Sequence, residues 1–359
     1  MLLYIILFAS LILCGLLEVS TVSDSIALKR PARKKLLYSL IPVCIILFFG
    51  IFKEVNVGYD SDTYYTYYWS LVDRYSWIDL ATDFSLDNGF FAVLKIIRLF
   101  TNDWWVARAI LFVFTFVLYW KVILTDSPFP TVSLIIFSGL GMLGLLCSIL
   151  RQALAGAITI FAYKQIRKGS WMKCLLFILL AATIHKTALC CIYMLIIYFL
   201  WSRRFNVIRL ALLSGVSYLA VLVAIPLLSA IYANSRYKDG ILSDGGYGML
   251  LFIVVVLGLS MILFRMTNEN NNKNLNYLFN LSSGALFIQM GALSFALWNR
   301  IAVYFSFYWC LLLPGLLARL SLKKRILFFL IIAVLFGFMF FYQLSDVDLF
   351  VLHDFHRRV

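Results

Sequence analysis

Long apolar runs separated by short polar stretches recur along the whole chain. A membrane-spanning helix needs about 20 mostly apolar residues, with roughly 17 to 25 tolerated. The runs near this length predict spans at residues 2–17, 36–52, 105–124, 131–149, 152–166, 172–185, 187–201, 207–231, 248–264, 276–298, 301–318 and 326–342. The pattern predicts an all-α polytopic integral membrane protein, with about 12 transmembrane helices in a single transmembrane domain over residues 1–359.

Composition agrees with this class. Of the 359 residues, 63% are hydrophobic and 13% are charged, whereas soluble domains are about half apolar and a quarter charged. The net charge is +14, but the basic residues form short clusters between apolar runs rather than one stripe. This pattern excludes a soluble enzyme, a disordered tail and a nucleic-acid-binding protein.

The first apolar run and the cysteines add little chemistry. Residues 2–17 have no Lys or Arg before them and no small-x-small site after them, so we expect a retained first helix rather than a cleaved signal. All seven cysteines lie inside apolar runs, and no Cys or His spacing typical of a metal site occurs. We read them as small apolar side chains and expect no cofactor and no metal.

The placement of basic residues predicts the orientation. The five cations between Lys29 and Lys35 indicate a cytoplasmic first loop and an amino terminus outside. Alternation then places the loops near 121–130, 164–173, 202–209, 265–275 and 319–325 inside. Four of these five loops carry cationic clusters, and the 121–130 loop has only Lys121. The predicted outer loops lack such clusters.

Residues 53–104 form the first large outer loop and are rich in acidic and aromatic side chains. Tyr64, Tyr68, Leu71 and Tyr75 recur at helical spacing. We expect an aromatic helix at the outer interface, serving either as part of an aromatic belt or as a stacking platform for sugar rings. The apolar run at residues 89–100 is too short to span a membrane, so we expect an interfacial or re-entrant segment there.

The second outer loop, residues 232–247, is rich in glycine and contains Arg236. Such a loop is typical of a plain flexible connection or of a mobile lid.

A few charged residues lie beside apolar spans at the predicted outer side. Arg151 begins a span, Arg300 precedes another, and Lys186 follows His185 at the middle of a long apolar stretch. Such charges are costly and need a reason. One reading is snorkelling toward outer headgroups. The other is a cluster, with Arg236 assisting, that binds the phosphate oxygens of a lipid-linked phosphate or diphosphate.

His185 is the only histidine outside the last seven residues. An imidazole has an unperturbed pKa near 6.5 and is the usual proton acceptor in general base catalysis, although a lone membrane histidine is also commonly a hydrogen-bonding structural residue. Asp60 and Asp62 compete for the role of base. Their D-x-D spacing is also typical of metal-dependent glycosyl transfer, but nucleotide sugars are cytoplasmic and this loop is predicted outside.

Four short segments resemble elements of the EpsG/Wzy family of polysaccharide polymerases. Gly58 to Tyr64 resembles its G-x-D-x-x-x-Y element, and Arg151 to Ala155 resembles its R-Q-x-x-A helix start. His185 to Ala188 resembles its H-x-[ST]-A turn, and Asn299 to Phe305 resembles its late arginine element. Each motif is short, but their order and shared outer placement make the set more specific.

The resemblance implies a glycosyltransferase that polymerises undecaprenyl-diphosphate-linked repeat units into O-antigen, capsule or exopolysaccharide. It implies a multi-pass protein of the bacterial inner membrane with an active site toward the periplasm or exterior. Its partners would be the lipid-linked donor and acceptor glycans and the lipid bilayer, with a chain-length regulator protein and a flippase as further partners, and no nucleic acid.

The expected site residues have separate roles. Arg151 and Arg300 would bind the donor diphosphate with help from Lys186 and Arg236, and His185 or Asp60 would deprotonate the acceptor. The remaining expected substrate-binding residues are Gln152, Asp62, Tyr64, Tyr68, Trp69 and Tyr304.

Other membrane functions remain open at this stage. A lipid-oligosaccharide flippase or another transporter would share the membrane and the cations, although no internal repeat is visible. An acyltransferase using His185 resembles this layout, but such enzymes pair the histidine with an upstream asparagine, and none lies between Asn102 and Asn206. A ligase-like enzyme would share the fold class and the outer site.

Overall fold

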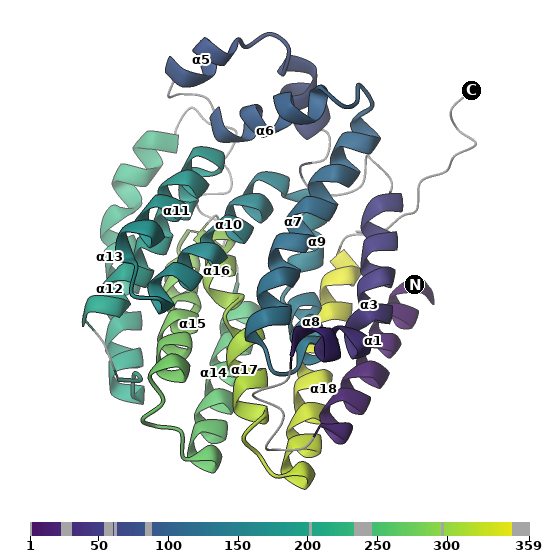
Figure 1. Ribbon diagram of the computed structural model, residues 1–359. Coiled ribbons are helices and arrows are strands. Elements are labelled where there is room, and N and C mark those ends of the chain that lie inside the picture. The colour runs from purple at the N-terminus through teal and green to yellow at the C-terminus, as the bar shows by residue number, and fades with distance from the viewer. Residues whose placement is uncertain are drawn as a thin grey trace. The chain divides into compact units, whose positions relative to one another are not determined.

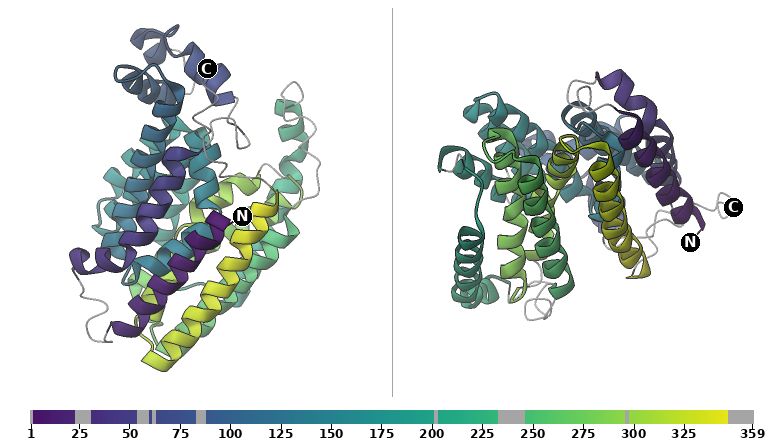
Figure 2. Two further views of the ribbon diagram at one scale, coloured as in Figure 1. Left: turned by 90° about the vertical axis from the view of Figure 1, so that its right-hand side faces the viewer. Right: turned by 90° about the horizontal axis from the view of Figure 1, so that it is seen from below.

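The computed structural model describes residues 2–22, 31–53, 60, 63–82, 88–200, 203–232, 246–295 and 298–346. Within these ranges the chain is almost entirely helical and contains no β-strand. Figures 1 and 2 show the helices coloured along the chain. These helices divide between two compact units. Unit 1 comprises residues 1–191 and 321–359, and unit 2 comprises residues 192–320.

Unit 1 contains most of the predicted site residues. Its helices are α1 (Leu2–Thr21), α3 (Ala32–Phe52), η1 (Tyr64–Trp69), α5 (Trp77–Thr82), α6 (Asn88–Arg98), α7 (Trp104–Asp126), α8 (Pro130–Gly139), α9 (Met142–Ser148), α10 (Leu150–Arg167), α11 (Trp171–Ile184), η2 (Lys186–Ile192) and α18 (Leu322–Asp346). The described residues of 63–103, which include η1, α5 and α6, we call the cap (Figure 1). The end of unit 1 that carries the cap is the cap end.

Unit 2 contains α12 (Tyr193–Leu200), α13 (Val207–Tyr232), α14 (Tyr247–Thr267), α15 (Lys273–Ala292), α16 (Asn299–Ser306) and α17 (Trp309–Leu317). The buried amide of Asn280 on α15 accepts a hydrogen bond from the backbone N–H of Phe205 and donates one to the carbonyl of Arg203, at 2.9 Å each. A polar side chain in the apolar interior thereby stabilises the turn before α13.

The all-α polytopic class is confirmed, but the expected count of twelve membrane helices is not. Among the described residues, seven helices are long and apolar enough to cross a membrane, and the bent pair α8 and α9 would make eight. Two of the other expected spans are short, because α11 has 14 residues and η2 with α12 covers only Lys186–Leu200. A third, α10, carries three basic residues in 18 positions and buries most of its length.

A buried arginine stabilises the end of α3. Arg108 on α7 is only 2% exposed and donates to the carbonyls of Gly50, Ile51 and Lys53 at 3.0, 3.1 and 2.9 Å. The last carbonyls of a helix have no partner within the helix, and its carboxyl end attracts a cation. Arg108 therefore has a structural role that satisfies three carbonyl groups at once.

Buried charges stabilise helix ends at the opposite end of unit 1 as well. Lys35 donates to the carbonyl of Ser127 at 2.7 Å, just after α7 ends. Arg325 donates to the carbonyl of Val22 at 2.7 Å, just after α1 ends. The carboxylate of Glu18 accepts from the backbone N–H of Thr131 at 2.9 Å, in the first turn of α8. Each charge has the sign that its helix end favours.

Candidate functional site

The cap begins with a π-helix rather than the α-helix that the aromatic spacing predicted. In η1 the backbone N–H of Ser70 donates to the carbonyl of Tyr65, which is the i to i+5 pattern of a π-helix. This wider turn places Tyr64, Tyr68 and Trp69 together on the buried side. Short π-helical turns occur frequently at functional sites.

The last cap helix, α6, is amphipathic and packs under η1. Its buried side chains include Phe90 and Phe91, and the ring of Tyr68 lies 5.3 and 5.1 Å from them. Leu99 and Phe100, just beyond its end, are 79% and 78% exposed. A short helix with apolar side chains on both an inner and an outer side suits a membrane surface, and the interfacial or re-entrant segment expected at residues 89–100 stays a prediction.

Arg151 is held by the aromatic side chains of η1. Its guanidinium carbon lies 4.7 Å from the ring centroid of Tyr68 and 6.0 Å from that of Tyr64, within the range of cation–π attraction. Its backbone N–H donates to the hydroxyl oxygen of Tyr64 at 3.3 Å. The positive charge of Arg151 in the first turn of α10 is repelled by the positive end of the helix dipole. The contacts with the two tyrosine rings offset this repulsion.

Asp60 lies beside the same tyrosine. Its carbonyl accepts the backbone N–H of Tyr64 at 3.1 Å. Burial raises the pKa of the Tyr64 phenol, the negative charge of Asp60 raises it further, and Arg151 opposes both effects. Tyr64 is therefore protonated at neutral pH. The structure brings Asp60, Tyr64, Tyr68 and Arg151 together, while Asp62 lies outside the described residues.

Trp69 belongs to a neighbouring cluster that the sequence did not reveal. Its ring lies 5.5 Å from that of Trp104, and the guanidinium of Arg98 stands 4.7 Å from the Trp69 centroid. Arg98 also pairs with Asp73 at 2.9 Å. The only sequence signal was a basic residue in the last turn of a short amphipathic helix, which does not identify its partner.

The rings expected to stack on sugars are buried in this structure. Tyr64, Tyr68 and Trp69 are 1%, 3% and 4% exposed, because they pack against α6, α7 and Arg151. Other aromatic side chains of the cap are open, with Tyr65, Tyr67 and Trp77 at 53%, 45% and 54% exposure. The exposed rings of the cap are thus other aromatic residues than the three predicted ones.

His185 lies where α11 ends. Its backbone is extended, its N–H donates to the carbonyl of Ala181, and its carbonyl accepts from Ala188 in the turn into η2. Helices α10 and α11 pack along each other and are joined by a tight turn at 168–170. The start of α10 and the end of α11 therefore lie at the same end, which is the cap end. His185 is half-buried and Lys186 is exposed.

Gly89 brings the cap against the end of α11. A Cβ atom at this position would lie 2.3 Å from Thr183 Oγ1 and 2.8 Å from the Thr183 carbonyl carbon. A backbone atom at that distance cannot move aside without shifting α6 or α11. Only glycine allows this close contact, which lies two residues before His185.

We expect Gly89→Ala to lower the protein's activity by about tenfold, because displacing α6 by a fraction of an ångström disturbs the residues that it positions. The matched control is Gly215→Ala on α13, where a new Cβ meets nothing within 4 Å. The measurement is activity per folded protein in membranes. Equal activity of both variants would show that the close contact between α6 and α11 is unimportant for activity.

The remaining predicted residues have these positions. Gln152 follows Arg151 and is buried at 1% exposure. Arg300 and Tyr304 lie on α16 of unit 2, where Arg300 is partly exposed and Tyr304 is 4% exposed. Arg236 lies outside the described residues. The roles of all four in substrate binding stay predictions. Among the described residues, no group of three or more His, Cys, Asp or Glu side chains is placed to hold a metal ion.

The fold and these side chains define a polytopic helical membrane protein with an amphipathic aromatic cap and a basic side chain held beneath it. The EpsG family matches residues 37–353, which is most of the chain. The chain therefore belongs to the EpsG family, a family of polysaccharide polymerase-like membrane proteins. No curated protein and no solved structure matches it.

Proposed function

We propose that this protein is a membrane glycosyltransferase that polymerises undecaprenyl-diphosphate-linked oligosaccharide repeats at the outer face of the bacterial inner membrane. The observation that carries the proposal is Arg151, held by two tyrosine rings of the cap at the start of α10. Membership of the EpsG family supports the polymer chemistry. The product would be an O-antigen, a capsule or an exopolysaccharide.

The placement of charge supports an outer site at the cap end. The opposite end of unit 1 carries the basic residues Arg33, Lys34, Lys164, Arg167 and Lys168 at helix ends. Cytoplasmic ends of membrane helices are enriched in Lys and Arg. The cap end then faces away from the cytosol. In the proposed function, lipid-linked repeats are polymerised on this outer side.

Arg151 stabilises the diphosphate leaving group. The donor is a glycan whose first sugar is bonded through its anomeric carbon to the diphosphate. As that bond breaks, negative charge grows on the diphosphate oxygen, and a guanidinium in a site of limited hydration stabilises it. The aromatic rings orient Arg151 before the substrate arrives, so little reorganisation is required. Arg300 keeps its predicted role in binding the donor diphosphate, and Lys186 and Arg236 keep their predicted assisting roles.

His185 deprotonates the acceptor. An acceptor hydroxyl gives its proton to the imidazole nitrogen, its oxygen bonds to the anomeric carbon, and the electron pair of the broken bond leaves with the diphosphate. The products are a glycan longer by one repeat unit and a free lipid diphosphate carrier. Tyr65, Tyr67 and Trp77 offer exposed rings that orient the sugars.

The test is the lipid-linked material that accumulates when the gene is deleted. A lost polymerase leaves single repeat units at the outer face, and restoring the gene returns long chains. Repeat units trapped on the cytoplasmic face would instead assign the protein as a flippase. A purified protein that extends lipid-linked repeats in vesicles, without any other protein, would complete the proof.

A further inference from the structure

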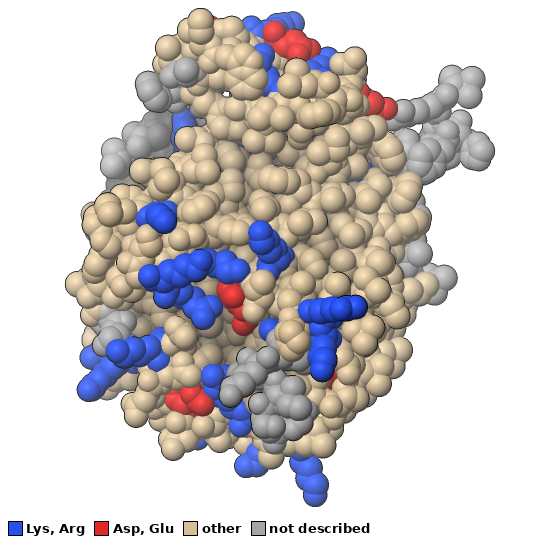
Figure 3. Space-filling view, in the orientation of Figure 1, with Lys and Arg blue, Asp and Glu red and all other residues tan. Residues whose placement is uncertain are grey.

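A hollow at the opposite end of unit 1 from the cap is lined mainly by basic side chains. Asp126 at the end of α7 and Lys164, Arg167 and Lys168 at the end of α10 form its walls, and its volume is about 210 Å³. The formal charge of this lining is +2. In the space-filling view, Lys and Arg side chains surround a small acidic area on the face shown (Figure 3). We call these four residues the basic pocket.

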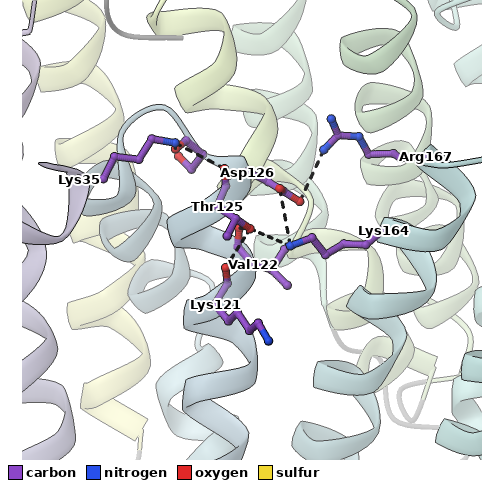
Figure 4. Close-up of polar contacts among 8 residues, drawn as sticks. Lys35, Lys121, Val122, Thr125, Asp126, Lys164 and Arg167 are labelled. Atoms are coloured by element: carbon purple, nitrogen blue, oxygen red, sulfur yellow. Dashed lines mark hydrogen bonds and ion pairs between the residues drawn. The ribbon is translucent and has the colours of Figure 1, made fainter. Parts of the chain in front are cut away.

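The carboxylate in the basic pocket engages its cations only loosely. Asp126 lies 3.7 Å from Lys164 Nζ and 3.5 Å from Arg167 Nη1 (Figure 4). Charge-assisted hydrogen bonds are shorter, at about 2.7–2.9 Å. Lys164 instead donates to the hydroxyl of Thr125 at 2.7 Å. One acid at these distances does not balance three cations.

The pocket is also partly withdrawn from water. The side chains of Asp126, Lys164 and Arg167 are 14%, 22% and 34% exposed. Screening by solvent is weaker there than on an open surface, so the excess positive charge attracts an anion more strongly. Lys164 and Arg167 lie three positions apart on α10, which places them on one side of the helix, and Lys168 directly follows the end of α10.

We propose that the basic pocket is a binding site for a phosphate group. The planar fork of Arg167 matches phosphate oxygens, and the two lysines add point charges around it. The pocket lies at helix ends, the level at which the headgroups of anionic phospholipids carry the same chemistry as soluble phosphate. This inference uses none of the residues assigned to polymerisation and stands without that function.

The experiment uses the full-length protein in a phosphate-free maltoside detergent. Phosphatidylglycerol, inorganic phosphate and diacylglycerol, which has the same chains but no phosphate, are added separately. Binding is followed by the thermal midpoint and, for the lipids, by native mass spectrometry. We expect phosphatidylglycerol or phosphate to bind and diacylglycerol not to bind.

Two double variants separate the pocket from general charge attraction. Arg167→Gln with Lys168→Gln should weaken binding by about tenfold or more, since it removes the fork and one point charge. Arg33→Gln with Lys173→Gln removes the same charge from exposed positions at the same end and should change binding by less than about twofold.

Asp126→Asn should change the affinity for phosphate in the opposite direction. Removing a negative charge a few ångströms from a bound phosphate should tighten binding by about fivefold. A carboxylate that only ties α7 to α10 would give no such gain. Gel filtration checks that each variant remains folded.

Binding of phosphatidylglycerol alone assigns a lipid headgroup, and binding of inorganic phosphate assigns a soluble anion; both support the site. The proposal is overturned if neither binds, if both double variants lose binding equally, or if Asp126→Asn fails to tighten it.

Discussion

Arg151→Ala should lower the rate of polymerisation by about 100-fold or more while leaving the protein at its normal level in the membrane. Removing one preorganised donor from a site of developing charge typically costs this much. Alanine keeps the helix start of α10 and the backbone N–H that donates to Tyr64. The change therefore removes the guanidinium without removing the contact between α10 and the cap.

The chain offers a matched control for this variant. Arg98 also lies 4.7 Å from the centroid of an aromatic ring in the cap, the same distance as Arg151 from Tyr68. Arg98 already pairs with the carboxylate of Asp73, so its charge is less available to a diphosphate. We expect Arg98→Ala to change the rate by less than about tenfold, as for a partly exposed ion pair.

Lysine at position 151 distinguishes charge from geometry. Arg151→Lys keeps one positive charge but loses the planar fork that contacts two phosphate oxygens, so we expect a rate between those of Arg151→Ala and the native protein. The measurement is the ladder of chain lengths made by membranes with equal protein content. Full-length chains from Arg151→Ala, or equal losses in Arg151→Ala and Arg98→Ala, would exclude the proposed role in diphosphate binding.

The sequence predicted the helical membrane class because apolar runs of sufficient length have few other structures available to them. It also predicted that residues 53–104 would carry short helices. It did not predict the count of apolar spans. A run such as 152–166 is read as membrane-spanning by its length, yet α10 is largely buried by its neighbours and carries basic residues near both ends.

Charge within apolar runs was a less certain guide to function. Arg108 interrupts an apolar stretch much as Arg151 does, but it is buried against three carbonyls at the end of α3. Arg325 has the same role at the end of α1. Such partners lie about 55 or 300 residues away in the chain, so only the folded structure separates a helix-end contact from a candidate substrate contact.

The aromatic cap shows a similar limit. Spacing in the sequence indicated which of its side chains share a side, and Tyr64 and Tyr68 do so. Spacing cannot tell whether that side faces substrate or the protein interior. In the structure it faces α6 and Arg151, so these two tyrosines position a basic side chain, and the more exposed rings are their neighbours in the chain.

His185→Ala should lower polymerisation by about 100-fold to 10,000-fold, which is the usual contribution of a general base. The imidazole is half-buried where α11 ends, so a substitution there leaves the helix intact. His353→Ala, at a position that none of the proposed roles involves, is the control of the same residue type and should be neutral. Asp60→Asn is the comparison for the competing base.

A second readout separates a base from a positioning residue. Added imidazole should restore part of the rate of His185→Ala, because a small base can enter the space that the side chain leaves. A residue that only orients Arg151 would not be rescued in this way. If His185→Ala keeps the native rate while Asp60→Asn loses it, the base is Asp60, which lies beside Tyr64. If both variants polymerise normally, neither residue removes the proton, and the proposed assignment of the base is wrong.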